Sequence, residues 1–217
     1  MEKDSRFRKG ITLSVLLLAL FLVFTVMVKT VDTAPVGFAG ERIGFSAVNK
    51  AVHDMFPYDE GAYEFTKILG YVCLMVVAVN GLTAAFDFFR QKCRISMMDS
   101  RNIITCVYYV VVGIFYVLFE FVVINNRPIA AEASYPSSHT MLALCVLYSE
   151  FVLLGFRAEK FGFWASIMRI ICLTAMISMV VFRALCGVHW ITDICGGVLL
   201  SLSLMSFYGT CIRRFCR

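Results

Sequence analysis

Six apolar runs, each long enough to cross a lipid bilayer as a helix, divide this sequence. The hydrocarbon layer is about 30 Å thick and takes about 20 residues of α-helix to cross. The chain is 60% hydrophobic and only 16% charged, which excludes a soluble globular domain and a disordered chain. We therefore predict an all-α membrane protein, a bundle of six transmembrane helices forming a single domain over residues 1–217. The runs cover residues 11–28, 68–89, 103–124, 140–156, 161–182 and 190–212.

The distribution of basic residues predicts how the bundle is oriented. Short cytoplasmic connections carry more Lys and Arg than outer ones. Thirteen of the 20 basic residues lie in the amino terminus, the second and fourth connections and the tail, whereas six lie in or beside the first, third and fifth connections. Both termini are therefore predicted to be cytoplasmic, in a multi-pass protein of the cell membrane. The first run lacks a small-residue cleavage pattern after Lys29, so we expect it to remain as an anchor.

The long first outer connection, residues 29–67, contains a second helical pattern. Its apolar residues recur at helical spacing, and Pro57 would end the helix. We predict an amphipathic helix that lies in the outer membrane interface. His53 falls on it and is interpreted as a solvated surface histidine without a catalytic role. The apolar positions are Phe45, Val48, Val52 and Met55 or Phe56.

Three polar clusters interrupt or border the apolar runs, where polar residues are costly and informative. Arg127-Pro128 follows the third run, and Pro136-Ser137-Ser138-His139 begins the fourth. Arg183, His189 and Asp193 connect the fifth run to the sixth. The orientation inferred from the loop charges places all three clusters at the outer face, so we expect them to form one site.

The clusters have the composition of a phosphoryl-transfer site. Two serines at a helix start offer hydroxyls and unpaired N–H groups to an anion, and the guanidiniums of Arg127 and Arg183 suit phosphate oxygens. His189 and Asp193 lie four residues apart, so the carboxylate can hold one imidazole nitrogen protonated and leave the other free as a nucleophile. His139 is then available as an acid.

The order Arg-Pro, Pro-Ser-x-His and Arg-x5-His-x3-Asp resembles the type 2 phosphatidic acid phosphatase (PAP2) superfamily, also called lipid phosphate phosphatases. The resemblance implies that His189 attacks phosphorus to form a phosphohistidine and that Asp193 orients it. It implies that His139 protonates the leaving lipid alcohol and later activates water, and that no metal or other cofactor is needed. The groups implied to bind the phosphoryl oxygens are Arg127, Ser137, the Ser138 backbone N–H and Arg183.

Three positions depart from the motifs of this family. Ser138 replaces a glycine, which leaves its backbone N–H available, and Phe182 replaces a serine that often precedes the arginine of the third motif. Glu120 occupies the place of the lysine in Lys-x6-Arg-Pro, where a carboxylate would repel phosphate unless it is paired or protonated. Seven residues is nearly two helical turns, so we expect Glu120 to pair with an arginine such as Arg127 and orient it. If both arginines are neutralised instead, the protein is a degenerate member.

Each cluster also has an alternative interpretation. His139 could be a buried histidine that is satisfied by a backbone carbonyl, and the arginines could extend to lipid headgroups. His189 and Asp193 could share a metal ion, although the sequence offers no obvious third ligand. Two charges inside the spans, Glu150 and Arg169, are at similar depth and are predicted to form an ion pair between adjacent antiparallel helices.

We expect hydrolysis of a phosphomonoester or diphosphate on a lipid headgroup, because the site lies at headgroup depth. Phosphatidic acid, phosphatidylglycerol phosphate and an isoprenyl diphosphate such as undecaprenyl diphosphate all remain open. Two alternatives are a phosphotransferase with a lipid or sugar acceptor and a non-catalytic protein that binds anionic lipid. The expected partners are the lipid phosphate and the bilayer, with no nucleic acid, and composition does not indicate the oligomeric state.

Overall fold

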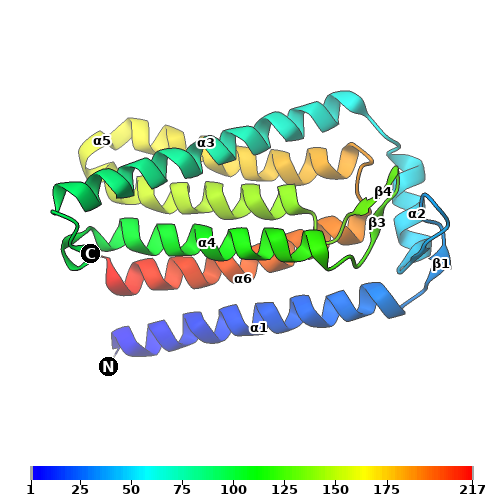
Figure 1. Cartoon of the computed structure of the whole chain (residues 1–217), viewed down its shortest axis with the longest axis horizontal. Coiled ribbons are helices and arrows are strands. Elements are labelled where there is room, and N and C mark those ends of the chain that lie inside the picture. Colours follow the sequence, from blue (N-terminus) through cyan, green and yellow to red (C-terminus); the bar gives the residue numbers. More distant parts are fainter. Residues whose placement is uncertain (1, 217) are drawn as a thin grey trace.

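Six long helices cross the molecule side by side (Figure 1). We describe a computed structural model of the chain that covers residues 2–216, apart from the side chains of residues 159 and 160. The helices are longer than the predicted apolar runs, because they continue into the polar residues that flank each run. Their bounds are α1, Glu2–Thr30; α3, Glu60–Arg90; α4, Ser100–Phe121; α5, Ser138–Leu185, which contains the spans Ser138–Ala158 and Phe161–Leu185; and α6, Ile191–Phe215. The prediction of six spans is confirmed.

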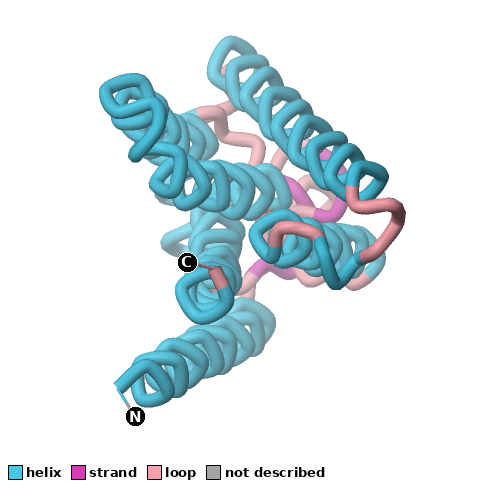
Figure 2. Tube along the Cα trace, turned by 90° about the vertical axis from the view of Figure 1, so that its left-hand side faces the viewer, coloured by secondary structure: helices cyan, strands magenta, loops and turns pink. Residues whose placement is uncertain are grey.

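The two spans of α5 are joined by a reversal of the chain at Gly162, whose φ of 43° and ψ of −110° lie outside the helical region. Figure 1 shows that both chain ends lie at one end of the bundle. The short strands and helix α2 gather at the opposite end, which we call the site end. A view along the bundle shows α1 on its periphery (Figure 2). It packs against α6, where Ser203 Oγ donates to the carbonyl of Ser14 at 2.9 Å.

Large apolar side chains cover the outside of the bundle. Leu16, Leu82 and Phe121 are 61%, 71% and 82% exposed, respectively. Water would make such a surface costly, whereas hydrocarbon suits it. The interior is packed with buried aromatic and aliphatic residues, for example Phe21, Tyr208 and Leu200. The protein is therefore a multi-pass membrane protein.

The site end is built from short elements between the spans. Strands β1, Ala34–Pro35, and β2, Arg42–Ile43, pair antiparallel, and so do β3, Asn126–Arg127, and β4, Ala130–Ala133. Helix α2, Ser46–Met55, confirms the predicted helix before Pro57. The opposite end of the bundle has one turn of 3-10 helix, η1, Ile95–Met97, between α3 and α4.

Helix α2 is fixed to the start of α6. Asn49 Nδ2 donates to Thr192 Oγ1 at 3.0 Å, and the Thr192 backbone N–H donates to Asn49 Oδ1 at 3.2 Å. His53, expected to be a solvated surface residue, is half-buried, with its ring centroid 5.5 Å from that of Trp190. Burial lowers the pKa of His53.

The predicted ion pair between Glu150 and Arg169 is wrong. Glu150 instead pairs with Arg157 of its own helix at 3.2 Å and accepts a hydrogen bond from Asn80 Nδ2 at 3.0 Å. The Arg169 guanidinium lies 4.2 Å from the centroid of the Phe151 ring. A similar depth along two helices does not fix the direction in which their side chains point. Glu150 finds Arg157 on its own helix and Asn80 on α3 as partners.

The loop between α5 and α6 is held by a close approach at Gly187. This residue has φ +64°, and a Cβ added to it would lie 2.6 Å from the carbonyl carbon of Pro57. The neighbouring Cys186 carbonyl accepts from the backbone N–H of Asp59 at 3.1 Å. The backbone before His189 is therefore positioned by the chain segment that follows α2.

We expect Gly187→Ala to destabilise the protein, because it combines an unfavourable φ, which costs about 1–3 kcal/mol, with a backbone clash. The apparent Tm in detergent should fall by about 5 °C or more. Gly81→Ala is the matched control, since nothing lies within 4 Å of a Cβ added in that part of α3. Thermal unfolding of both variants checks this, and equal Tm values would contradict the proposed constraint.

Candidate active site

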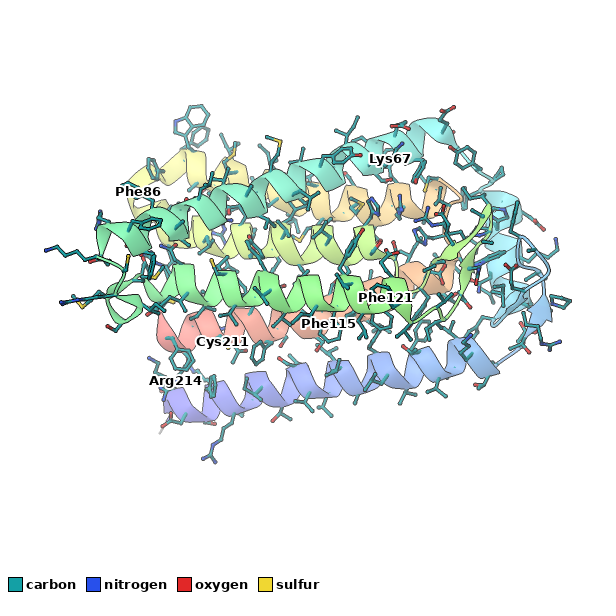
Figure 3. All side chains as sticks on the ribbon, viewed as in Figure 1. Lys67, Phe86, Phe115, Phe121, Cys211 and Arg214 are labelled. Carbon is teal, nitrogen blue, oxygen red and sulfur yellow. The ribbon has the colours of Figure 1, made fainter. Side chains whose placement is uncertain are left out.

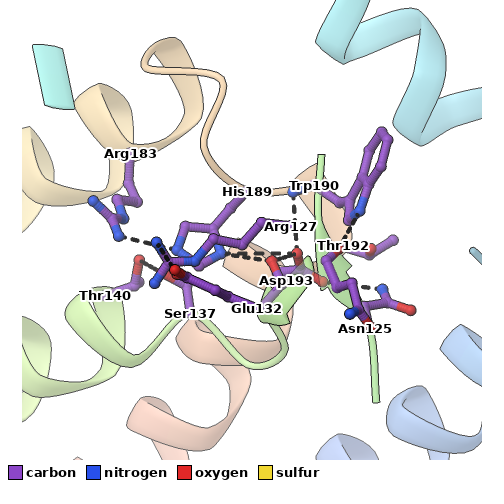
Figure 4. Close-up of polar contacts among 12 residues, drawn as sticks. Asn125, Arg127, Glu132, Ser137, Thr140, Arg183, His189, Trp190, Thr192 and Asp193 are labelled. Atoms are coloured by element: carbon purple, nitrogen blue, oxygen red, sulfur yellow. Dashed lines mark hydrogen bonds and ion pairs between the residues drawn. The ribbon is translucent and has the colours of Figure 1, made fainter. Parts of the chain in front are cut away.

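The three sequence clusters meet at the site end of the bundle (Figure 4). The β3–β4 hairpin supplies the first cluster, the start of α5 the second, and the end of α5 with the start of α6 the third. The second and third clusters are in direct contact, because the Ser137 backbone N–H donates to the carbonyl of Asp193 at 2.9 Å. The residues predicted from the sequence that come together here are Arg127, Ser137, His139, Arg183, His189 and Asp193.

A serine that the sequence analysis missed connects His189 to Asp193. Ser134 Oγ lies 2.9 Å from His189 Nδ1 and donates to Asp193 Oδ2 at 2.5 Å. The direct separation between His189 Nδ1 and Asp193 Oδ2 is 3.8 Å. Because the hydroxyl proton is used toward Asp193, the Ser134 oxygen is left to accept from Nδ1–H. This arrangement assigns the proton of His189 to Nδ1 and the lone pair to Nε2.

Asp193 is completely buried, and three donors surround its carboxylate. Besides Ser134, Asn125 Nδ2 donates to Oδ1 at 3.1 Å and the Trp190 backbone N–H donates to Oδ2 at 3.0 Å. Asp193 also lies in the first turn of α6, where the helix dipole favours negative charge. These contacts compensate for burying the carboxylate and fix its direction toward His189.

The environment of His189 favours its neutral form. Burial is the largest cause, and the positive charges of Arg183 and Arg127 add to it, so the pKa of His189 lies well below its usual range. Nε2 therefore carries a lone pair at neutral pH, and Arg183 Nη2 donates to it at 3.0 Å. A neutral imidazole with an available Nε2 is the form that can act as a nucleophile.

Arg183 approaches both histidines with one nitrogen, Nη2. Its Nη2 is 3.4 Å from His139 Nδ1, and its Nη1 donates to Thr66 Oγ1 of α3 at 2.8 Å. The side chain is completely buried. Nε of Arg183 and Nε of Arg127 are buried without a hydrogen-bond partner in the part of the chain that the structure describes. Two guanidiniums with unused donors suit an anion with several oxygens.

Arg127 pairs with Glu132 across the hairpin at 3.2 Å, and the predicted pairing with Glu120 is wrong. Helix α4 ends at Phe121, so the chain leaves the helical path before it reaches Arg127 and the seven-residue spacing no longer places the two on one face. Glu120 is exposed and forms no ion pair with any residue from 2 to 216.

The serines at the start of α5 have different surroundings. Ser137 is buried, its N–H is used toward Asp193, and its Oγ accepts from Thr140 Oγ1 at 2.9 Å. Ser138 is half-buried and is the first residue of α5, where backbone N–H groups lack partners within the helix. Phe182, which replaces the family serine, packs on Phe65 with ring centroids 4.6 Å apart. Its role here is helix packing.

Four contacts of the site were not predicted from the sequence. Ser134 and Asn125 lie close to predicted motifs, so their nearness to Pro136 and Arg127 was an available signal. Trp190 acts through its backbone N–H, which no side-chain pattern reveals. Thr66 lies 117 residues before Arg183, and only the packing of α3 on α5 brings it there.

A metal pair was the alternative for His189 and Asp193. Ser134 lies between them, and its hydrogen bonds use both facing atoms. Within residues 2–216, no group of three or more His, Cys, Asp and Glu side chains is placed to hold a metal ion.

A cavity of about 520 Å³ leads to His139 between α3, α4 and α5. Its wall is mostly apolar and aromatic, and among the described residues Lys67 and His139 are the basic side chains that line it. An apolar space beside a polar phosphate site suits a lipid with a charged head. The lining includes Tyr63, Lys67, Gly70, Tyr109, Tyr116 and Leu142.

The sequence profile of the PAP2 superfamily matches residues 69–215. The chain belongs to the PAP2 superfamily. The structure of this PAP2 protein is similar to the crystal structure of the first transmembrane PAP2 type phosphatidylglycerolphosphate phosphatase from Bacillus subtilis. The TM-score is 0.60 at 20% sequence identity, over 91% of this chain and 93% of that one. No curated protein matches the sequence.

Family membership and the shared fold support lipid phosphatase activity in general for this PAP2 protein. A membrane-embedded phosphatase also fits a lipid substrate presented by the bilayer. The residues predicted from the resemblance lie in the profile match, from Arg127 to Asp193.

We expect Ser134→Ala to lower kcat for phosphate release about 10- to 100-fold, because His189 Nδ1–H and Asp193 each lose a buried hydrogen bond. Ser134 is a positioning residue, so KM should change little and the pH profile of kcat/KM should shift. The matched control is Ser203→Ala, since Ser203 is also buried but bonds to the α1 backbone. Similar losses in the two variants would argue against the positioning role.

Proposed function

We propose that this PAP2 protein is a metal-independent lipid phosphate phosphatase that acts through a phosphohistidine at His189. The observation that carries the proposal is the hydrogen-bonded series Asp193, Ser134 and His189, which directs a neutral Nε2 toward Arg183. His139 Nδ1 lies 3.4 Å from the same Arg183 Nη2 that donates to His189. A nucleophile and an acid are thus available beside one anion-binding guanidinium.

In the first step, Nε2 of His189 attacks phosphorus and the bond from phosphorus to the lipid oxygen breaks. Protonated His139 gives its proton to that oxygen, so the lipid leaves as an alcohol or, from a diphosphate, as a monophosphate. Arg127, Arg183, the hydroxyl of Ser137 and the N–H of Ser138 stabilise the charge on the phosphoryl oxygens. Asp193 stabilises the positive charge that His189 gains.

In the second step, water attacks the phosphohistidine. His139, now neutral, takes a proton from the water, and the bond from phosphorus to Nε2 breaks to release inorganic phosphate. His189 recovers its lone pair, and His139 is again protonated for the next cycle. Every step uses groups of the chain and water, so the proposal needs no cofactor.

The proposed substrate is a lipid with a phosphomonoester or diphosphate head. The similar Bacillus subtilis structure is of a phosphatidylglycerolphosphate phosphatase, which supports this class for the present chain. The cavity beside His139 offers apolar walls to the chains of such a lipid. We place the site at the extracytoplasmic face of the cell membrane, on the basis of the basic residues in the opposite connections.

We expect His189→Ala to abolish phosphate release and the labelled phosphoenzyme. His139→Ala should instead accumulate phosphoenzyme from an aryl phosphate, because that leaving group needs no proton whereas hydrolysis still needs the base. The measurement is ³²P retained by the protein after an alkaline quench, in the presence of EDTA. Wild-type turnover in His189→Ala would exclude the nucleophile, and loss of turnover in EDTA alone would exclude the metal-free mechanism.

Two glutamates near Arg127 give a matched pair of variants. Glu132→Gln should lower KM for a lipid phosphate about 2- to 5-fold, since an exposed ion pair is worth up to about 1 kcal/mol and Arg127 would be freed for phosphate. Glu120→Gln should change KM less than about twofold, because Glu120 pairs with neither arginine. Initial rates in detergent micelles decide this, and a larger fall in KM for Glu120→Gln than for Glu132→Gln would contradict the assignment of Glu132 as the partner of Arg127.

A further inference from the structure

A lysine outside the family motifs reaches the cavity beside His139. Lys67 belongs to the half of α3 nearer the site end (Figure 3) and lines the cavity together with His139. Gly70, one helical turn farther along α3, also lines it. A Cβ added to Gly70 would lie only 3.2 Å from His139 Cδ2. Residues three apart share a helix face, so Lys67 is on the face of α3 that approaches His139.

The present contacts of Lys67 are weak enough to be exchanged for a substrate anion. Its ammonium pairs with Glu64 on the same helix, and the side chains are 32% and 51% exposed. Exposed ion pairs of this kind contribute little. Nζ also lies 4.9 Å from the centroid of the Tyr63 ring, and Arg183 Cζ lies 5.2 Å from the same centroid. One ring thus has Lys67 and the phosphate-binding Arg183 as neighbours.

The position of Lys67 relates it to the leaving group. In the proposed reaction the nucleophile is His189, and the leaving oxygen receives a proton from His139. The cavity is lined in part by His139, and under the proposed function it holds the lipid part of the substrate. Lys67 lines that cavity, whereas Arg127 and Arg183 do not, and in the proposed reaction they surround the transferred phosphoryl group. A cation at this place favours a leaving group that is itself negatively charged.

We propose that Lys67 binds the second phosphate of a lipid diphosphate and makes such lipids preferred over lipid monophosphates. This inference rests on the proposed function. When Nε2 of His189 attacks the terminal phosphorus, the bond to the bridging oxygen breaks. The lipid monophosphate leaves with a proton from His139, and its remaining charge is stabilised by Lys67. The ion pair of Lys67 with Glu64 is replaced by one between Lys67 and the substrate phosphate.

The test compares farnesyl diphosphate with farnesyl phosphate in detergent micelles, because these two lipids share one chain and differ in the second phosphate. Lys67→Gln should lower kcat/KM about tenfold for the diphosphate and about twofold for the monophosphate, since a hydrogen bond to a charged group is lost for the former alone. Lys67→Arg should retain the preference. Glu64→Gln should lower KM for the diphosphate, because Lys67 then has no competing partner.

Lys50→Gln is the matched control, because Lys50 also forms an exposed ion pair with a residue four positions away on a helix of the site end. It should leave the ratio of the two kcat/KM values unchanged. Equal losses for both substrates in Lys67→Gln, or no loss, would overturn the role of Lys67. Wild-type hydrolysis of the monophosphate but not the diphosphate would do the same. If the wild type hydrolyses neither lipid, the proposed function itself fails.

Discussion

The buried carboxylate of Asp193 is the contact on which the arrangement of the site depends. It accepts hydrogen bonds from Asn125 before the β3–β4 hairpin, from Ser134 after the hairpin, and from the backbone of Trp190. Its own carbonyl accepts from Ser137 at the start of α5. A single residue therefore joins both sides of the β3–β4 hairpin to the starts of α5 and α6. The cost of burying its charge is offset by donors that also fix these segments.

Burying the charge of Arg183 at the end of a membrane span is unfavourable, so its presence there indicates a function. Arg183 is completely buried near one end of a span, where Thr66, the two histidines and the Tyr63 ring contact its guanidinium. A buried cation with unused donors is unfavourable until an anion arrives. The proposed phosphate would provide the missing negative charge, so substrate binding and stabilisation of this end of the bundle would reinforce each other.

The spans and the three polar clusters could be predicted because charged residues are rare in apolar runs and each one is conspicuous. Pairings between side chains could not be predicted in the same way. Glu120 and Arg127 share a helical phase in the sequence, but α4 ends before Arg127. Arg169 and Glu150 have similar depth, but Phe151 and Arg157 are nearer partners. The paths of loops and the rotation of helices decided these contacts, and neither has a signature in a single sequence.

Ser134 shows what the missing geometry changes in the chemistry. A direct bond from His189 to Asp193 was the expectation, and the inserted hydroxyl keeps the same polarity, because it donates to the carboxylate and accepts from Nδ1–H. The lone pair of Nε2 then accepts a hydrogen bond from Arg183. Under the proposed function, phosphate oxygens are stronger acceptors for a guanidinium than a neutral imidazole is. Arg183 would therefore both bind the phosphate and, by moving away from Nε2, free His189 to attack phosphorus. Phosphate recognition would in this way be coupled to the first chemical step.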